Sequence, residues 1–212
     1  MSILYDMNSL LVKKFLIISI IIVIFCIVSK YTYECLENKS EVFFNNVKSK
    51  QKIKIYDIIH NNIPSARNLK IIVDSIPFIL FFYILFIDIN LFYAVLGMLI
   101  PIFIVRLFVI NITILPKDKK CDIVKDSSPY IGGCYDKVYS GHFAVFFTCL
   151  LFLYKKKYIN MFIFALSSII MGTLIVASRS HYTIDIIVSF LIVLVFYQNN
   201  ISACRIIDKY IK

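Results

Sequence analysis

Long apolar runs constrain the fold of this chain more than any other feature of its sequence. They consist mainly of Ile, Leu, Phe and Val, and runs of about 20 residues are long enough to cross a bilayer as helices. Of all residues 60% are hydrophobic and 17% are charged, and the mean hydropathy is +0.82, which a soluble domain does not need. The runs are continuous and do not alternate, so a transmembrane β-barrel is excluded.

We therefore expect an all-α integral membrane protein with several membrane passes, folded as a single six-helix transmembrane bundle over residues 1–212. Within it we expect an N-terminal anchor helix at about 15–29 and a core at about 55–198. The predicted membrane segments are 15–29, 71–87, 91–112, 141–154, 159–177 and 182–197, with ends correct to a few residues.

Six segments place both termini on one side of the membrane. The loops 35–70 and 111–139 and the turn 178–181 then share the other side. The three lysines at 155–157 and the positive-inside rule favour the cytosol for the termini, and hence the lumenal or exoplasmic face for these loops.

Two features of these loops stay open. Asn38 begins an N-glycosylation sequon, which would be used only if its loop is lumenal. Cys121 and Cys134 share the second loop, where a disulfide and two free thiols are both consistent with the sequence.

The formal net charge of +10 raises the question of nucleic acid. The basic residues fall between the apolar runs, where they would meet lipid headgroups. No soluble domain is left to carry a nucleic-acid site, so nucleic acid is not expected as a partner.

His181 and Asp185 stand at the mouth of the last apolar segment. If a helix begins at Tyr182, the two residues lie one turn apart on one face. A carboxylate there can hold one imidazole nitrogen and leave the other as a nucleophile or base. A carboxylate in a membrane segment costs about 2.5 kcal/mol or more to insert, so it is usually functional. The alternative is a pair that only fastens a helix end.

Ser140, Gly141 and His142 form a second polar group, at the start of the fourth segment. A helix start offers backbone N–H groups to an anion, here with a hydroxyl and a histidine beside them. The sequence therefore indicates a phosphate site with a proton donor. The alternative is a turn followed by a histidine among the headgroups. No Cys/His spacing indicates a metal, and no cofactor is expected.

With these two groups the chain resembles the sphingomyelin synthase family, the lipid phosphotransferase branch of the type-2 phosphatidic acid phosphatase superfamily. One family motif reads C-G-D-x3-S-G-H, and residues 134–142 read CYDKVYSGH. Another reads H-Y-T-x-D-[VI], and residues 181–186 read HYTIDI. Arg106, followed by NITILP at 111–116, matches a family Arg with a Thr-rich stretch ending in Leu-Pro, and looser likeness reaches back to residue 55.

The resemblance implies transfer of phosphocholine, or a related headgroup, from a glycerophospholipid to ceramide, with diacylglycerol as the second product. His181, oriented by Asp185, would attack phosphorus and form a phosphohistidine. His142 would protonate the departing oxygen and then deprotonate the ceramide hydroxyl. The residues expected to bind substrate are Asp136, Ser140, Gly141, Arg106 and Arg179.

Some of these roles have alternatives. Arg106 either supports phosphate binding or extends to the headgroups. Asp136 contacts a cationic headgroup, holds His142 or is a solvated loop residue. Arg179 stands where the family usually has an acidic-His-type stretch, and Tyr135 replaces a family glycine.

The plain phosphatase branch fits less well. Its K-x6-R-P motif is absent, and Ile175 stands where an Arg is expected six residues before the second His. The phosphatase branch uses these Arg and Lys side chains to hold a doubly charged terminal phosphate. Their absence favours a phosphodiester substrate, which carries less charge. A lipid phosphate phosphatase, an inositol or ethanolamine phosphorylceramide synthase and a non-catalytic membrane protein stay open as alternatives. The sequence also leaves open the membrane (Golgi, endoplasmic reticulum or plasma membrane) and whether the chain forms a homo-oligomer.

Overall fold

The structure, a computed structural model, describes residues 2–46, 55–113, 115, 135, 137–199 and 201–202. Within these residues the fold is all helical, with no strand, as the sequence predicts. The elements in chain order are α1 (Ser2–Asn46), α2 (Ile58–Asn62), the 3₁₀ helix η1 (Arg67–Leu69), α3 (Lys70–Ile87), α4 (Ile89–Ile112), α6 (Gly141–Lys155), α7 (Met161–Ala177) and α8 (Thr183–Gln198).

Each of the six predicted segments corresponds to an apolar helix. In the part of the chain that the structure describes, three stretches are long and apolar enough to cross a membrane, namely Ser19–Phe44, Arg67–Ile87 and Ile89–Ile112. The helices α6, α7 and α8 are also apolar but shorter, with 15, 17 and 16 residues. The helices support an integral membrane protein, and the predicted number of six crossings stays a prediction.

α1 is longer than the anchor predicted at 15–29. It continues to Asn46, through residues that the sequence analysis assigned to a loop. Residues 35–46 contain no Gly or Pro that would end a helix, and the Ser40 hydroxyl satisfies its hydrogen bond within the helix, on the Leu36 carbonyl at 2.5 Å. A helix without a stop signal therefore runs past the end of its most apolar part.

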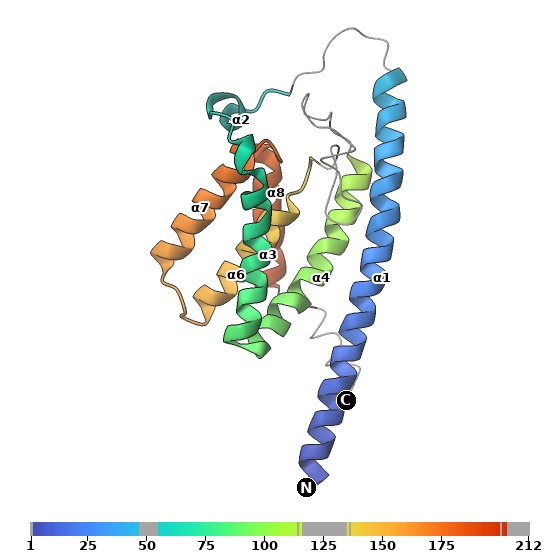
Figure 1. Cartoon of the computed structure of the whole chain (residues 1–212), viewed down its shortest axis with the longest axis vertical. Coiled ribbons are helices and arrows are strands. Elements are labelled where there is room, and N and C mark those ends of the chain that lie inside the picture. The colour runs from blue at the N-terminus through green and yellow to red at the C-terminus, as the bar shows by residue number, and fades with distance from the viewer. Residues whose placement is uncertain are drawn as a thin grey trace.

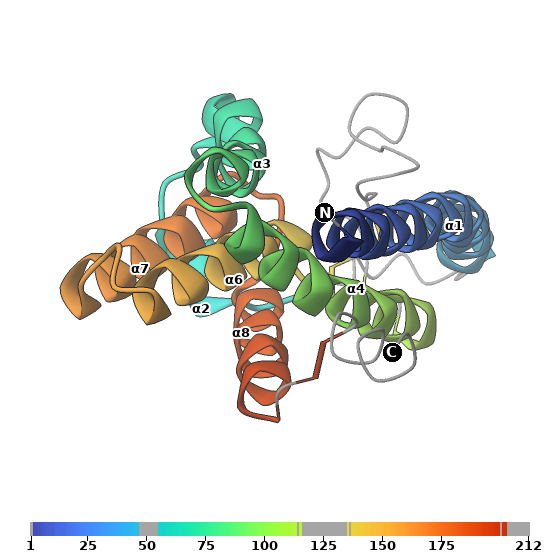
Figure 2. The same cartoon turned by 90° about the horizontal axis from the view of Figure 1, so that it is seen from below.

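α6 is the central helix of the bundle. It packs against α3, α4, α7 and α8, and Figure 2 shows it among these four helices. A helix that is hydrophobic all round is usually buried on all sides. Accordingly, residues 143–151 of α6 are all buried.

α1 lies at the edge of the molecule beside α4, along which it runs in Figure 1. Many of its apolar side chains are exposed, among them Ile20, Val23 and Ile27. This is the arrangement expected of a helix whose outer face meets lipid.

Helix ends that are distant in sequence meet at one end of the bundle, the upper end in Figure 1. The Ser140 amide donates to the Asp185 carbonyl at 3.4 Å, which joins the starts of α6 and α8. The Ala66 amide donates to the Ala177 carbonyl at 2.8 Å, which joins the approach to α3 to the end of α7. The structure thus gathers the polar residues singled out in the sequence at this end.

Candidate active site

His181 is fixed by Asp185. The Nδ1 atom of His181 lies 3.0 Å from Oδ2 of Asp185, and the same oxygen accepts a hydrogen bond from the Tyr182 amide at 2.9 Å. Asp185 is in the first turn of α8, where the helix dipole also favours a negative charge. With an ionised Asp185, Nδ1 carries the proton and Nε2 keeps its lone pair. The predicted pairing of these residues is present in the structure.

The surroundings of His181 favour the neutral imidazole. Burial lowers the pKa of His181 well below its ordinary value, and the positive charges of Lys137, Arg106 and Lys70 lower it further. A neutral imidazole with an oriented Nε2 is the form that a nucleophile or a base requires.

Asp57 holds the start of α8 from outside the helix. Its Oδ2 accepts from the Thr183 amide and its Oδ1 from the Thr183 hydroxyl, both at 2.6 Å, and Oδ1 also accepts from the His60 amide at 2.8 Å. Burial alone would raise the pKa of Asp57, but these hydrogen bonds bring it below its ordinary value. An ionised Asp57 therefore ties α2 to the residue that follows the His181–Tyr182 pair.

Arg179, predicted to bind substrate, makes its described contacts with the α2 region. Its guanidinium donates to the His60 carbonyl and, at 2.8 Å, to the Ile63 carbonyl. Its φ of 65° is in the left-handed region, unusual for a residue other than glycine. Arg179 therefore fastens the turn between α7 and α8 to the α2 region, and nothing in these contacts brings it to the two histidines.

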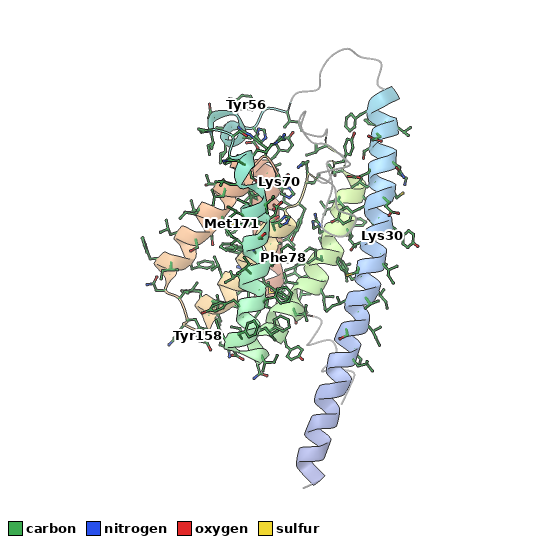
Figure 3. The ribbon with its side chains drawn as sticks, in the orientation of Figure 1. Lys30, Tyr56, Lys70, Phe78, Tyr158 and Met171 are labelled. Carbon is green, nitrogen blue, oxygen red and sulfur yellow. The ribbon has the colours of Figure 1, made fainter. Side chains whose placement is uncertain are left out.

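His142 lies in the first turn of α6. Its Nε2 is 3.9 Å from Oδ1 of Asp74 in α3, and its ring makes an edge contact with Phe78 at a centroid distance of 5.9 Å. Figure 3 shows Phe78 and Lys70 on α3, the helix that carries Asp74. Asp74 could not be predicted from the sequence, because no local spacing connects it to a histidine 68 residues away.

Ser140 is the N-cap of α6. Its hydroxyl accepts from the Phe143 amide at 3.3 Å, the usual task of a serine at this position. The Ser140 hydroxyl, predicted to bind phosphate, is thus engaged with the helix backbone in this geometry. The amides of Gly141 and His142 in the first turn of α6 remain suited to bind an anion.

Ser189 joins the two predicted motifs. Its hydroxyl accepts from the Ser140 amide at 2.9 Å, and its proton is shared between the carbonyls of Ser140 (3.0 Å) and Asp185 (2.6 Å). Ser189 is fully buried in α8, one turn after Asp185 on the same face. A lone serine in an apolar helix, four residues after the candidate carboxylate Asp185, is the signal that would have identified it.

Arg106 reaches the start of α6. Its Nε donates to the Tyr139 carbonyl at 3.4 Å, its guanidinium donates to the Tyr33 hydroxyl, and its charge lies over the Tyr33 ring at 5.3 Å. It is only 3% exposed, so it does not extend to the headgroups. A Cβ at Gly141 would lie 3.2 Å from Nε, so the glycine permits this close approach.

Lys137 is a buried cation that the sequence analysis did not identify. Its ammonium donates to the carbonyl of Ser180, the residue before His181. Lys137, Lys70 and Arg106 come from three different parts of the fold, and the charges of all three act on the imidazoles of both His142 and His181. These three cations contribute positive charge at the site, which suits an anionic group.

Asp136, Cys121 and Cys134 lie outside the described residues, so the predictions for them are not tested. Among the residues that the structure describes, no group of three or more His, Cys, Asp or Glu side chains could hold a metal ion.

The geometry defines a class of site: two histidines at adjoining helix starts, one oriented by a carboxylate, amid cations. The family model for the PAP2 superfamily C-terminal region matches residues 133–201, which include both histidines and Asp185. No curated protein and no solved structure matches the chain significantly. This match supports a likeness to the type-2 phosphatidic acid phosphatase superfamily, whose members are phosphatases or phosphotransferases, and so a phosphoryl-transfer enzyme in general.

Proposed function

We propose that the chain is a membrane phosphotransferase of the sphingomyelin synthase type, which moves a phospho-headgroup from a glycerophospholipid to ceramide. The observation that carries the proposal is the joining of the two motifs by Ser189, which brings the start of α6 and the start of α8 together. The motif resemblance supports the choice of lipids, and the site geometry supports the chemistry.

In the first half-reaction, Nε2 of His181 attacks phosphorus and forms a P–N bond. The P–O bond to diacylglycerol breaks, and His142 donates a proton to the departing oxygen. Asp185 stabilises the positive charge that develops on His181, through the hydrogen bond at 3.0 Å. The Asp74 carboxylate, 3.9 Å from Nε2 of His142, would stabilise the protonated form of His142 that this step requires.

In the second half-reaction, His142 accepts the proton of the ceramide primary hydroxyl. The ceramide oxygen attacks phosphorus, the P–N bond breaks, and His181 leaves as the neutral imidazole. Both histidines and Asp185 then return to their starting forms. In this proposal the amides at the first turn of α6 and the guanidinium of Arg106, which approaches Gly141, stabilise the charge on the phosphoryl oxygens.

A lipid phosphate phosphatase is the second candidate, with water in place of ceramide. One observation favours it: the positive charges of Lys70, Arg106 and Lys137 all act on both histidines. A terminal phosphate carries more negative charge than a phosphodiester and would use them well. The absence of the phosphatase branch's own Arg and Lys motifs is therefore a weaker argument for a phosphodiester than it is from sequence alone.

A cell-free assay on membranes that contain the full chain tests the proposal. Fluorescent ceramide is offered with phosphatidylcholine, phosphatidylethanolamine or phosphatidylinositol separately, and phosphatidic acid is offered alone. We expect a phosphorylated ceramide product from one donor, absent with His181→Ala. Phosphate release from phosphatidic acid without any ceramide product would instead establish the phosphatase. Neither product, from a protein that is folded and inserted, would exclude both enzymes.

The matched control is Asp88→Asn. Asp88 caps α4, where its side chain accepts from the Asn90 and Leu91 amides at 2.9 and 3.1 Å. Asn is an equally good N-cap, so this variant removes a carboxylate away from the histidines and should keep full activity.

A further inference from the structure

Lys137 joins the two loops that carry the histidines. It precedes Ser140 by three residues and His142 by five, and its ammonium donates to the carbonyl just before His181. It is only 6% exposed. Lys137 therefore belongs to the Ser140–His142 motif by its place in the chain, and its side chain contacts the segment that carries His181.

Burying an ammonium group is costly unless nearby negative or polar groups compensate. A methionine or leucine could fill a similar volume at lower cost. The charge of Lys137 acts more strongly on His181 than that of Arg106 or Lys70, and it also acts on His142. The contact with the Ser180 carbonyl puts the ammonium beside the peptide bond that leads into His181, and Lys137 itself is five residues before His142.

Phosphoryl transfer places negative charge on the non-bridging oxygens, and a lysine binds phosphate as a point charge with three N–H donors. We propose that Lys137 binds a non-bridging phosphoryl oxygen while its contact with the Ser180 carbonyl holds the ammonium next to the His181 segment. The inference rests on the phosphoryl-transfer site of the proposed function and holds for either acceptor, ceramide or water.

The competing explanation is a purely structural contact that holds the two loops together. Lys137→Gln distinguishes the two, because glutamine keeps an N–H donor for the Ser180 carbonyl but has no charge. Lys137→Arg keeps the charge and is the conservative rescue. Lys156→Met is the matched control, since Lys156 is exposed in the turn that follows α6 at the opposite end of that helix.

The experiment uses the purified full chain in detergent and orthovanadate, which adopts the five-coordinate geometry of phosphorus in transfer. Vanadate binding is followed by thermal shift and by vanadium NMR near neutral pH, so no lipid substrate is needed. We expect Lys137→Gln to weaken vanadate binding about 10-fold or more, and Lys137→Arg to stay within about 3-fold of the wild type. Lys156→Met should bind as the wild type does.

The inference is overturned if Lys137→Gln binds vanadate as tightly as the wild type, with or without a loss of thermal stability. It is also overturned if the wild type binds no vanadate. If vanadate binding depends on Lys137 but no lipid product forms from any donor, the inference stands and the proposed acceptor and donor are wrong. The vanadate measurement can therefore contradict the role of Lys137, and the lipid assay can contradict the proposed donor and acceptor, each without the other.

Discussion

His181 and His142 differ in how firmly each is held. His181 and its carboxylate lie four residues apart, 3.0 Å from each other, with 5% and 0% of their side chains exposed. His142 and Asp74 come from different helices, are 3.9 Å apart, and have 13% and 30% of their side chains exposed. One pair is tight and local, and the other is loose and spans two helices.

In the proposed mechanism, this difference in how the two histidines are held would suit two chemical tasks. A nucleophile must keep one orientation toward phosphorus, which a buried, directly bonded carboxylate provides. An acid–base residue must serve the oxygen that leaves and then the oxygen that attacks, so some freedom at its position is useful. The geometry therefore favours His181 as nucleophile and His142 as the proton donor and acceptor.

Replacement of His181 by Ala should have the largest effect. Without a nucleophile the covalent route is lost, and we expect turnover to fall by about 10⁴-fold or more. Product formation from the best lipid donor measures this, with size-exclusion chromatography in detergent to show that the protein is folded. Substantial residual turnover in His181→Ala would assign the nucleophile elsewhere.

His142→Ala should reduce turnover by about 10² to 10⁴-fold, the usual contribution of general acid–base catalysis. A short lipid analogue with a nitrophenolate leaving group separates the two histidines, because this group departs without a proton. The rate of formation of the phosphohistidine from the analogue should suffer much less in His142→Ala than in His181→Ala. Equal losses of this rate in the two variants would contradict the assignment of His181 as nucleophile and His142 as proton donor.

Asp185→Asn should lower turnover by about 100-fold, since an amide cannot stabilise the imidazolium that forms on His181. The Tyr182 amide should still find an oxygen acceptor at position 185, so helix α8 should keep its start. Turnover and helix content by circular dichroism test this together. Asp88→Asn is the control, and an equal loss there would show that the effect is not specific to the site.

Asp74→Asn should have a smaller effect, a loss of about 3- to 10-fold, because its oxygen is 3.9 Å from the imidazole and a long contact contributes less than a direct bond. The test is the ratio of rates with the natural and the nitrophenolate leaving groups. If Asp74 acts through His142, only the natural substrate should be affected. A loss of 100-fold or more would show that Asp74 matters to His142 as much as Asp185 does to His181, which contradicts the difference between the two pairs.

The smallest effect concerns pH. Because the pKa of His181 is lowered, its neutral form persists at pH values below the ordinary pKa of histidine, and the acid limb of the rate profile should lie there. Lys137→Gln removes a positive charge, which should raise the pKa of His181 and move the acid limb to higher pH. Rate profiles of the two proteins measure the shift. A move to lower pH would contradict the placement of the Lys137 charge.

The sequence predicted the local parts of this comparison and missed the long-range ones. The His181–Asp185 pair follows from a spacing of one helical turn, so it could be predicted. Asp74, Lys137 and Asp57 act on residues from 43 to 126 positions away, and no periodicity connects such pairs. Tertiary packing alone brings them together.

The same limit applies to the fold. The apolar runs predicted which segments are helical, since the hydrophobic effect acts on composition. They did not predict that α6 is central and α1 peripheral, because both are apolar and only their packing partners differ. The end of α1 was missed because helix ends depend on weak local signals, and no Gly or Pro marks one near Cys35.

The length of α6 has a consequence for the lipids. Fifteen residues rise about 22 Å, whereas the hydrocarbon core of a bilayer is about 30 Å thick. If the lysines after α6 stay in the headgroup layer, the histidine end stops about 8 Å short of the opposite layer. Hydrophobic mismatch would then draw the headgroups inward around the site, and bilayer thickness would become a determinant of the reaction rate.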